Sequence, residues 1–320
     1  MIWFGLSLFA GRRLGRRAAT DRGDPCTAFL ERVEQTLHFD YTTVGHVTID
    51  VLADGTRRAG GAAFYSALQA ARLGRRALIV TQGVASEIEA LLEPFRDELA
   101  LRVIPAPATT TLATTGAGAT RSQRVLAWAG PIADGLELDT AILHLAPVAR
   151  EVPRRWSGRS AFVGLTPQGL ARDWSGLGDE FVPRPPPAAA LELATATNGV
   201  VLSESEHASC TDLIAAAIAG GATVAITDGE RPCTLMAGDA TTRVEVPPLE
   251  PPHDDLGAGD VFAAALFVSL AAGEAAEDAA RFAMAAAAVR MSAAGSGGVG
   301  ERSAIERRLA WAQATRDPSA

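Results

Sequence analysis

The sequence contains no lysine, because all 29 of its cationic residues are arginine. A chain without lysine cannot form the Schiff base of pyridoxal-phosphate enzymes. It also lacks the phosphate-binding lysine of P-loop nucleoside triphosphatases and the nucleotide-pairing lysine of protein kinases. If the protein binds phosphate, the binding groups must be backbone amides, arginines or a metal ion.

Cysteine and histidine are scarce, with three and five residues in 320. Cys26, Cys210 and Cys233 form no CxxC pair, which excludes a disulfide framework and a cysteine zinc site and favours unpaired thiols in a reducing compartment. The histidines form no HxxxH or HExxH pair, so no histidine metal site is expected. No apolar run reaches the ~20 residues that span a bilayer. We therefore expect a cytoplasmic protein.

The charge balance is acidic, with 29 basic and 37 acidic residues and a net charge of −8. This argues against nucleic acid or an anionic membrane as the main partner. Residues 1–36 differ from the rest, since an apolar run precedes an arginine cluster, the reverse of a secretory signal. We expect residues 1–36 to be a disordered extension, with a membrane-surface anchor as the alternative. The folded domain is expected to span residues 37–314.

From residue 37 onward the pattern alternates short apolar strands with helices. Residues 42–49 predict a strand, and residues 62–73 predict a helix closed by Gly74. Further apolar runs predict strands at 77–81, 141–145, 161–165, 199–202 and 222–227, and helices are predicted at 211–219, 260–272, 275–293 and 302–314. Buried strands that alternate with helices indicate a parallel sheet covered on both faces.

Two segments depart from this alternation. Residues 109–128 are rich in threonine around Gly116 and Gly118, which predicts a β-hairpin. Residues 182–190 are rich in proline and are expected to form a surface loop, because the strand–helix pattern resumes directly after them.

The most informative stretch is residues 253–262, HDDLGAGDVF. Gly257, Ala258 and Gly259 lead directly into a predicted helix, and the unpaired amides at a helix start bind anions. Asp260 follows at once. An aspartate there is also a common helix cap, but a cap alone does not explain a carboxylate joined to a glycine-rich anion site. A phosphate cradle beside a base is what phosphorylation of a hydroxyl requires.

Residues 254–260, DDLGAGD, resemble the DTxGAGD signature of the ribokinase-like carbohydrate kinases, the PfkB family. Other motifs follow the order of that family over about residues 40 to 300. These are VGHVTID at 44–50, the pair Gly60 and Gly61, ARLG at 71–74, SESE at 203–206 in place of NxxE, and TDG at 227–229 in place of TxG.

The resemblance implies a three-layer α/β/α ribokinase-like fold with a mostly parallel central sheet and a reduced β-hairpin lid. It implies an ATP-dependent kinase that phosphorylates a hydroxyl of a sugar, a polyol such as inositol, or a nucleoside. Asp260 would be the general base, and the amides of Gly257, Ala258 and Gly259 would form the anion hole. Asp50, Gly60, Gly61 and Tyr65 would contact the substrate, Ser203, Thr227, Gly229 and Met284 the nucleotide, and Glu206 with Asp254 would hold Mg²⁺ through water.

The resemblance also allows for a monovalent cation as a cofactor and for a homodimer formed through the lid. The sequence departs from the family pattern at Asp255, Ser203, Met284 and Tyr65, where the family has threonine, asparagine, asparagine and asparagine. Only nine residues separate Asp50 from Gly60, so the hairpin at 109–128 is expected to be the only lid. These departures leave the substrate open.

Other residues carry weaker signals. Gln168 follows a predicted strand, where sites of α/β sheets gather. Arg121 and Arg124 on the hairpin are candidate phosphate or substrate contacts, with solvated lid charges as the alternative. Residues 295–300, GSGGVG, fit the dinucleotide motif in letters but follow a helix, where a Rossmann motif follows a strand. Two alternatives remain. One is a catalytically weak sugar- or nucleotide-binding regulatory protein, and the other, based only on the α/β pattern and the misplaced GSGGVG, is an NAD(P)-dependent oxidoreductase.

Overall fold

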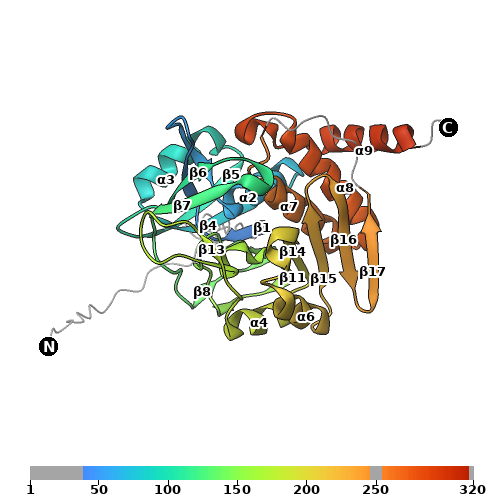
Figure 1. The fold of residues 1–320 in the computed structure, drawn as a ribbon, viewed down its shortest axis with the longest axis horizontal. Coiled ribbons are helices and arrows are strands. Elements are labelled where there is room, and N and C mark those ends of the chain that lie inside the picture. Colours follow the sequence, from blue (N-terminus) through green and yellow to red (C-terminus); the bar gives the residue numbers. More distant parts are fainter. Residues whose placement is uncertain (1–38, 246–253, 317–320) are drawn as a thin grey trace, which may run out of the picture. The chain divides into compact units, whose positions relative to one another are not determined.

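The structure is a computed structural model, which describes residues 39–245 and 254–316. The predicted extension, residues 1–36, lies outside these residues, as do Cys26 and His253. A nine-stranded sheet in the order β17-β16-β15-β14-β11-β9-β1-β4-β5 forms the centre (Figure 1). Its strands are β1 (Phe39–Val44), β4 (Ala77–Gly83), β5 (Leu99–Pro105), β9 (Thr140–Leu145), β11 (Ser160–Leu165), β14 (Gly199–Ser203), β15 (Thr223–Asp228), β16 (Arg231–Ala237) and β17 (Ala240–Val244).

The strands from β5 to β15 are parallel, and β16 and β17 add an antiparallel edge. Successive residues of a buried strand face opposite sides of the sheet. Ile79 of β4 accordingly packs in the cluster that contains α2 and α7, while Val80 packs in the cluster that contains α4 and α6. The mostly parallel sheet between two helical layers confirms the predicted three-layer α/β/α fold.

The helices mostly follow the predicted ranges. The helices predicted at 62–73 and 211–219 are α2 (Ala62–Arg72) and α6 (Thr211–Ala219), and Gly74 caps α2 with φ 82°. The others are α3 (Ala85–Leu92), α4 (Ala188–Thr195), α5 (Glu204–His207), α7 (Ala258–Ala271), α8 (Ala276–Met291) and α9 (Arg302–Arg316), with 3₁₀ turns η1 (Glu93–Phe95), η2 (Gly118–Thr120), η3 (Pro167–Leu170) and η4 (Gly295–Gly298). None of these helices is long and apolar enough to cross a bilayer.

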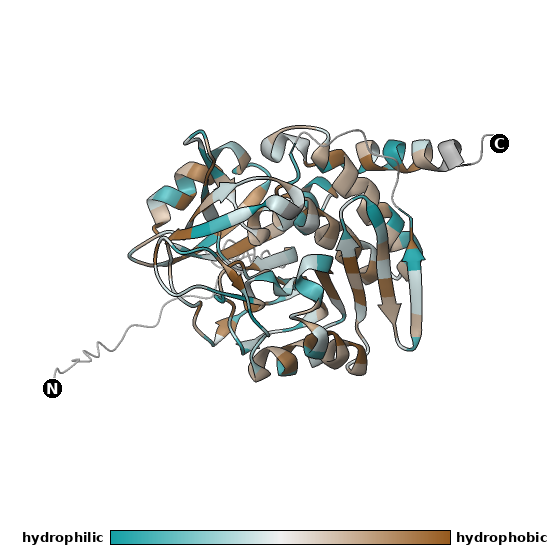
Figure 2. Ribbon diagram, viewed as in Figure 1, coloured by the Kyte–Doolittle hydropathy of each residue, from teal (hydrophilic) through white to brown (hydrophobic). Residues whose placement is uncertain are grey.

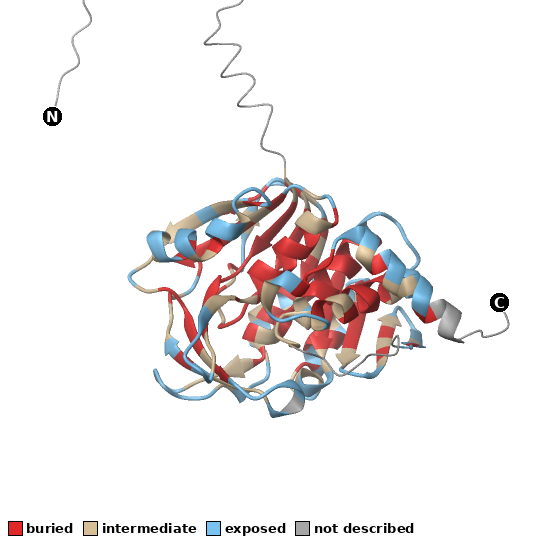
Figure 3. Cartoon of the chain, turned by 90° about the horizontal axis from the view of Figure 1, so that it is seen from above, coloured by how far each residue is buried: buried red, intermediate tan, exposed pale blue. Residues whose placement is uncertain are grey.

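Helix α7 lies in the middle of the domain. Its residues from Val261 to Ser269 are all buried. The interior of the domain, to which they belong, is red in Figure 3 and largely brown in Figure 2. A helix that is apolar on all sides is an interior helix, and α7 packs against α2 and α8. The start of α7, which carries the glycine-rich motif, is therefore held by the core.

The lid is larger than the sequence suggested. The strand predicted at 42–49 is broken at Gly45, where a β-carbon would lie 2.2 Å from the carbonyl oxygen of Ala146. The chain leaves the central sheet there and forms β2 (Thr48–Val51), which pairs with β3 (Arg57–Gly60) and with β6 (Thr111–Thr115). The predicted hairpin 109–128 is β6 with β7 (Ser122–Ala127), so the lid has four strands and the hairpin is not the only lid.

Residues 172–183, which connect β11 to α4, pair with β7 at the outer edge of this lid. The amide of Val125 donates to the backbone carbonyl of Asp179 at 3.0 Å, and the amide of Phe181 donates to the carbonyl of Gln123 at 3.1 Å. The same segment forms a small pair of strands, β12 (Arg172–Asp173) and β13 (Val182–Pro183), and a second short pair is β8 (Leu136–Glu137) with β10 (Trp156–Ser157). The proline-rich residues after β13 form the predicted surface loop before α4.

Two smaller expectations concern thiols and the GSGGVG sequence. Cys210 and Cys233 are buried free thiols, as predicted, although Cys26 lies outside the described residues. Residues Gly295–Gly298 form η4 after α8 rather than a turn after a strand. The structural context of a dinucleotide-binding motif is therefore absent at this position, and the oxidoreductase alternative loses its motif.

Candidate active site

One cavity of about 900 Å³ lies between the lid and the carboxyl ends of the central strands. Parallel α/β sheets form their sites at this edge. The lining comes from lid strands β2 and β7, from the segments after β9, β11, β14 and β15, and from the start of α7. Asp50 and Asp260, which are far apart in the sequence, line the same cavity. The cavity therefore brings together the two residues that the kinase hypothesis requires to share a site.

The start of α7 carries the three residues that were predicted to form an anion site. Gly257 precedes the helix with φ 82°, and a β-carbon there would lie 2.4 Å from Cγ of Tyr65, so both conformation and space require glycine. The Ala258 amide donates to the Asp255 carbonyl at 3.1 Å, whereas the amides of Gly257 and Gly259 donate to no backbone carbonyl of the described residues. Two of the three predicted amides are thus free to bind an anion, and the third also serves the turn.

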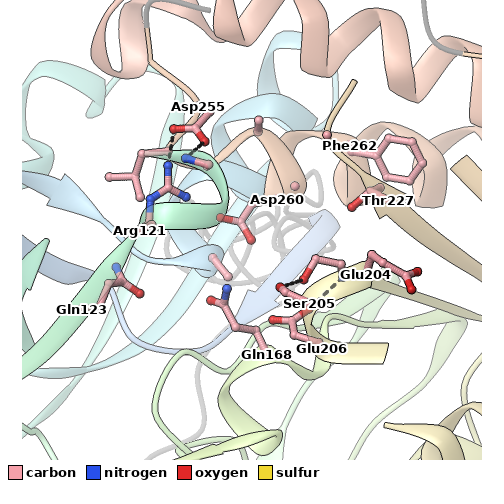
Figure 4. Close-up of a pocket in the computed structure, with 18 of the residues that line it drawn as sticks. Arg121, Gln123, Gln168, Glu204, Ser205, Glu206, Thr227, Asp255, Asp260 and Phe262 are labelled. Atoms are coloured by element: carbon pink, nitrogen blue, oxygen red, sulfur yellow. Dashed lines mark hydrogen bonds and ion pairs between the residues drawn. The ribbon is translucent and has the colours of Figure 1, made fainter. Parts of the chain in front are cut away.

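Asp260 lies in the first turn of α7 and is partly exposed to the cavity. Figure 4 shows its carboxylate in the space between Arg121 and Gln168. Burial raises the pKa of Asp260 to about 7, and the negative charge of Glu206 raises it further, while the charges of Arg172 and Arg121 oppose the shift. A carboxylate with a pKa near 7 can accept a proton from a bound alcohol at neutral pH.

Asp50 lies on β2 and is 2% exposed. Its Oδ1 accepts a hydrogen bond from the Thr48 hydroxyl at 2.8 Å. Burial raises the pKa of Asp50 to about 6, against the lowering effect of the Thr48 hydrogen bond and of nearby arginines. A β-carbon at Gly60 would lie 2.1 Å from Oδ2 of Asp50. Gly60 itself is not part of the lining, so its role is to leave room for the Asp50 carboxylate, whereas Gly61 lines the cavity.

The part of the cavity near Asp50 and Gln168, called the acceptor end below, contains an arginine that the sequence motifs missed. Arg172 donates from Nε to the Val148 carbonyl at 2.8 Å, from Nη1 to Gln123 Oε1 at 3.0 Å and from Nη2 to Gln168 Oε1 at 2.9 Å. Its guanidinium also lies 4.0 Å from the Phe181 ring centre. Burial lowers the pKa of Arg172 to about 10. Arg172 stands four residues after Gln168, in the segment that follows the end of β11. Its place near that strand end was the signal by which the sequence could have identified it as a site residue.

Arg172 fixes the orientation of Gln168. Because the Gln168 carbonyl oxygen accepts from Arg172, its amide nitrogen is left to donate into the cavity. Gln168 lines the cavity as predicted.

Two predicted substrate contacts differ from expectation. Arg124 is not part of the lining formed by the described residues, because its side chain pairs with Glu180 on the outer edge of the lid. Arg121, the other candidate arginine of the hairpin, lines the cavity. Tyr65 is 1% exposed and its ring lies beneath Gly257, so it offers the cavity little surface.

Asp255, which stands where the family has threonine, joins the anion site to the lid. Its carboxylate pairs with the guanidinium of Arg121 and accepts a 2.8 Å hydrogen bond from the amide of Gly118 (Figure 4). The extra negative charge at this position is therefore neutralised by the lid and does not face a bound phosphate alone.

The part of the cavity beside the ends of β14 and β15, called the donor end below, contains the other predicted residues. Ser203, Glu206, Thr227, Gly229 and Met284 all line the cavity. Glu206 Oε2 accepts a 2.8 Å hydrogen bond from the Ser203 amide, which leaves Oε1 without a hydrogen bond among the described residues. An apolar wall completes this end, formed by Phe262, Met284, Ala287 and Met291.

Asp254 does not line the cavity. Its Oδ2 accepts hydrogen bonds from Arg58 at 2.9 Å, from the Gly295 amide at 2.9 Å and from Arg290 at 3.3 Å. Burial alone would raise the pKa of Asp254, but these partners and the Leu256 amide lower it to about 2. The residue is occupied in holding loops together, so the expectation that it orients water around Mg²⁺ does not fit its contacts.

The residues fit the two expected cations differently. No group of three or more His, Cys, Asp or Glu side chains in the described ranges is arranged to hold a metal. Mg²⁺ keeps most of its waters and needs few protein ligands, so the free oxygen of Glu206 fits a magnesium that arrives with phosphates. The carbonyl oxygens beside Asp254 that would suit a monovalent cation instead accept hydrogen bonds from Arg290. The residues present do not fit that second cation.

Comparisons with known proteins bear on the family. The model of the pfkB family carbohydrate kinases matches residues 187–301, and no curated protein matches the chain by sequence. Among solved structures, a pyrophosphate-dependent kinase of the ribokinase family, complexed with a pyrophosphate analogue and myo-inositol, has TM-score 0.68 at 19% identity, with 83% of this chain and 99% of that chain covered.

Two further structures agree with this fold. Ribokinase of Arabidopsis thaliana, complexed with ribose and ATP, has TM-score 0.66 at 18% identity and covers 85% of this chain and 99% of its own. Fructokinase of Vibrio cholerae O395, with fructose, ADP and calcium, has TM-score 0.64 at 17% identity and covers 84% and 99%. The chain therefore has the ribokinase-like fold, and its motif-bearing residues 187–301 match the PfkB carbohydrate kinases, which confirms the resemblance found in its sequence.

Proposed function

We propose that this protein is a kinase that transfers the γ-phosphoryl group of ATP to a hydroxyl of a small sugar, polyol or nucleoside. The observation that carries the proposal is the single cavity in which Asp260, the free amides of Gly257 and Gly259, and Asp50 lie together. With Asp260 as base, the amides as anion site and Asp50 as a hydrogen-bonding group for the substrate, this cavity would hold the set of groups that phosphorylation of an alcohol needs.

In this mechanism Asp50 and the amide nitrogen of Gln168 hold substrate hydroxyls. Asp260 removes the proton from the reacting hydroxyl, whose oxygen forms a bond to the γ-phosphorus. The bond between that phosphorus and the β,γ-bridging oxygen breaks, and ADP leaves. The amides of Gly257 and Gly259 stabilise the negative charge on the transferring group. Mg²⁺, when bound near Glu206 with the phosphates, supplies charge neutralisation.

The acceptor end favours a neutral, hydroxyl-rich substrate. Asp50 accepts hydrogen bonds and Gln168 donates one, and their neighbours Gln123 and Arg172 are already bonded to each other. Myo-inositol is bound by one kinase of the same fold and ribose by another. We therefore place inositols and aldoses first among the candidate acceptors.

The donor is proposed to be ATP. The apolar wall of Phe262, Met284, Ala287 and Met291 gives a flat base a surface to pack on, which pyrophosphate would not use. Since one kinase of this fold is pyrophosphate-dependent, both donors belong in the assay. A rate with ATP at least tenfold above that with pyrophosphate supports the nucleotide, and the reverse ratio assigns pyrophosphate.

The experiment that tests the function measures ADP release across a panel of aldoses, inositols and nucleosides. Asp260→Asn should lower the substrate-dependent rate by ~10²–10⁴, the usual cost of losing a positioned general base. Asp239→Asn, an exposed residue in the turn between β16 and β17, is the matched control and should keep the full rate. Ligand binding without turnover, unchanged by Asp260→Asn, would instead favour the regulatory binding protein.

A further inference from the structure

Four oxygen atoms converge on one buried side chain behind the anion site. The guanidinium of Arg290 donates from Nη1 to the carbonyls of Asp254 at 3.2 Å and Ala293 at 3.1 Å. From Nη2 it donates to Asp254 Oδ2 at 3.3 Å and to the carbonyl of Leu256. Arg290 is 0% exposed. The side chain is thus a fully buried cation whose two terminal nitrogens donate to oxygen acceptors, while its Nε has no hydrogen-bond partner among the described residues.

Three backbone carbonyls and one carboxylate oxygen form a donor set suited to a hard cation such as K⁺ or Na⁺. A buried charge is stable only when such groups surround it, and buried carbonyls in turn need a donor or a cation. Here the guanidinium satisfies both requirements at once. Bound Arg290 and a metal ion cannot occupy the same acceptors together.

The position of these oxygens connects Arg290 to catalysis. Asp254 and Leu256 immediately precede Gly257, whose amide belongs to the anion site. The Arg290 guanidinium also lies 5.2 Å from the centre of the Tyr65 ring, on which Gly257 packs. Asp254 is shared with Arg58 of β3 and with the Gly295 amide of η4. Arg290 therefore fixes the loop from which the helix start and its amides project.

We propose that Arg290 is a built-in cation that positions the anion hole, so that the protein needs no monovalent metal ion. The proposal rests on the proposed kinase function for its activity readout, and it replaces the monovalent cation that the sequence motifs allowed for. Arg290 touches no reacting atom, and it acts as a positioning residue through Asp254 and Leu256.

The first test uses the unmodified protein. Its kcat and KM for ATP should agree within twofold in KCl, NaCl and choline chloride at equal ionic strength. Its melting temperature should likewise not change when choline replaces potassium. Activation of kcat by potassium of tenfold or more would overturn the proposal, and this measurement does not depend on any variant.

The second test removes the guanidinium. Arg290→Ala opens the oxygen cage, and kcat should fall at least 100-fold while circular dichroism retains the folded signal. Low millimolar guanidinium or 100 mM KCl should then restore kcat at least tenfold over choline chloride. Arg281→Ala on the exposed face of the same helix, whose partners are Glu277 and Asp278, is the matched control and should show no cation effect. A folded Arg290→Ala protein that neither cation rescues contradicts the proposal.

A stability readout separates this inference from the proposed function. The melting temperature of Arg290→Ala should rise in KCl relative to choline chloride, while that of the unmodified protein should not. If no acceptor is phosphorylated but this difference appears, the built-in cation stands and the kinase assignment fails. If phosphorylation occurs but the unmodified protein itself requires potassium, the kinase assignment stands and the built-in cation fails.

Discussion

At the scale of single residues, the site depends on carboxylates whose acidity the cavity changes. Asp260 has its pKa raised to about 7, and Asp50 has its pKa raised to about 6, in both cases mainly by burial. Asp254, one turn before Asp260, has its pKa lowered to about 2 because amides and arginines compensate its burial. The sequence presents these three groups alike, and only their surroundings distinguish the proposed base, the proposed substrate contact and the carboxylate that joins loops.

The raised pKa of Asp260 predicts the acid limb of the pH profile. A general base works only when ionised, so kcat/KM should rise with pH through an apparent pKa of about 7 in the free enzyme. Arg172 lowers the pKa of Asp260, so Arg172→Met should move the limb to higher pH in addition to reducing the rate. A pH-rate profile of both proteins checks this. A limb that stays in place, or that moves to lower pH, would contradict the assignment of the base.

The same shift predicts a stability effect. The pKa of Asp260 is raised in the folded state from its ordinary value of 3.8 to about 7. Between pH 3.8 and pH 7 the folded protein therefore binds more protons than the unfolded chain. Stability contributed by this group is therefore present at low pH and is lost as the pH rises through about 7. Relative to Asp260→Asn, the unmodified protein should lose about 3 °C or more of melting temperature between pH 5 and pH 8. If the melting temperatures of the two proteins changed with pH in the same way, the raised pKa of Asp260 would be refuted.

At the scale of elements, the start of α7 explains why the motif needs its glycines. Gly257 has φ 82° and packs on Tyr65, whereas a β-carbon at Gly259 would meet no atom within 4 Å. The two glycines therefore serve different purposes, since one shapes the turn and the other keeps the cavity open for phosphate.

Alanine substitutions separate these purposes. Gly257→Ala should destabilise the protein, by about 1–2 kcal/mol for the left-handed conformation alone and further because of the overlap with Tyr65. Gly259→Ala should leave the melting temperature unchanged and raise the KM for ATP, because its methyl group would stand where the phosphate approaches. Thermal unfolding and initial-rate measurements on both variants check this pair. Equal destabilisation by the two substitutions would be inconsistent with the geometry.

The lid is a second element whose behaviour follows from named contacts. Asp255 binds Arg121 and the Gly118 amide in the turn of the lid hairpin. Asp255→Asn weakens a partly buried charged contact of the kind worth ~1.5–3 kcal/mol. Amide hydrogen exchange in residues 111–127 should become at least about fivefold faster. Arg124→Met, which breaks an exposed ion pair between the same hairpin and Glu180, is the control and should change exchange little. Unchanged exchange in Asp255→Asn would show that this contact does not hold the lid.

At the scale of the whole molecule, much of the fold could be predicted from local pattern. The apolar runs in the central strands and the helix 211–219 are buried or half-buried elements whose periodicity is plain in the sequence. The break at Gly45 could not be predicted in this way, because it depends on the close approach of Ala146, 101 residues further along the chain. The second lid hairpin, β2 with β3, was missed because each of its strands has only four residues and β2 joins the lid through pairing with the distant β6.

The site was predictable where one motif carries both geometry and chemistry. The stretch 257–260 is such a case, because the helix start and the base are contiguous. Arg172 and Arg290 were not identified, because each acts through partners that are distant in sequence or through backbone carbonyls. Both hairpin arginines, Arg121 and Arg124, were candidates, because the sequence does not show which side of a hairpin faces inward, and only Arg121 lines the cavity.

The central claim is that the cavity transfers phosphate to an alcohol with Asp260 as the base. The most direct measurement is ³¹P nuclear magnetic resonance of the reaction with ATP, Mg²⁺ and the best acceptor from the panel. The unmodified protein should produce a phosphomonoester resonance together with ADP, and Asp260→Asn should produce neither over the same time. A phosphomonoester formed equally fast by Asp260→Asn, or none formed by the unmodified protein with any acceptor although it binds ATP, would contradict the account.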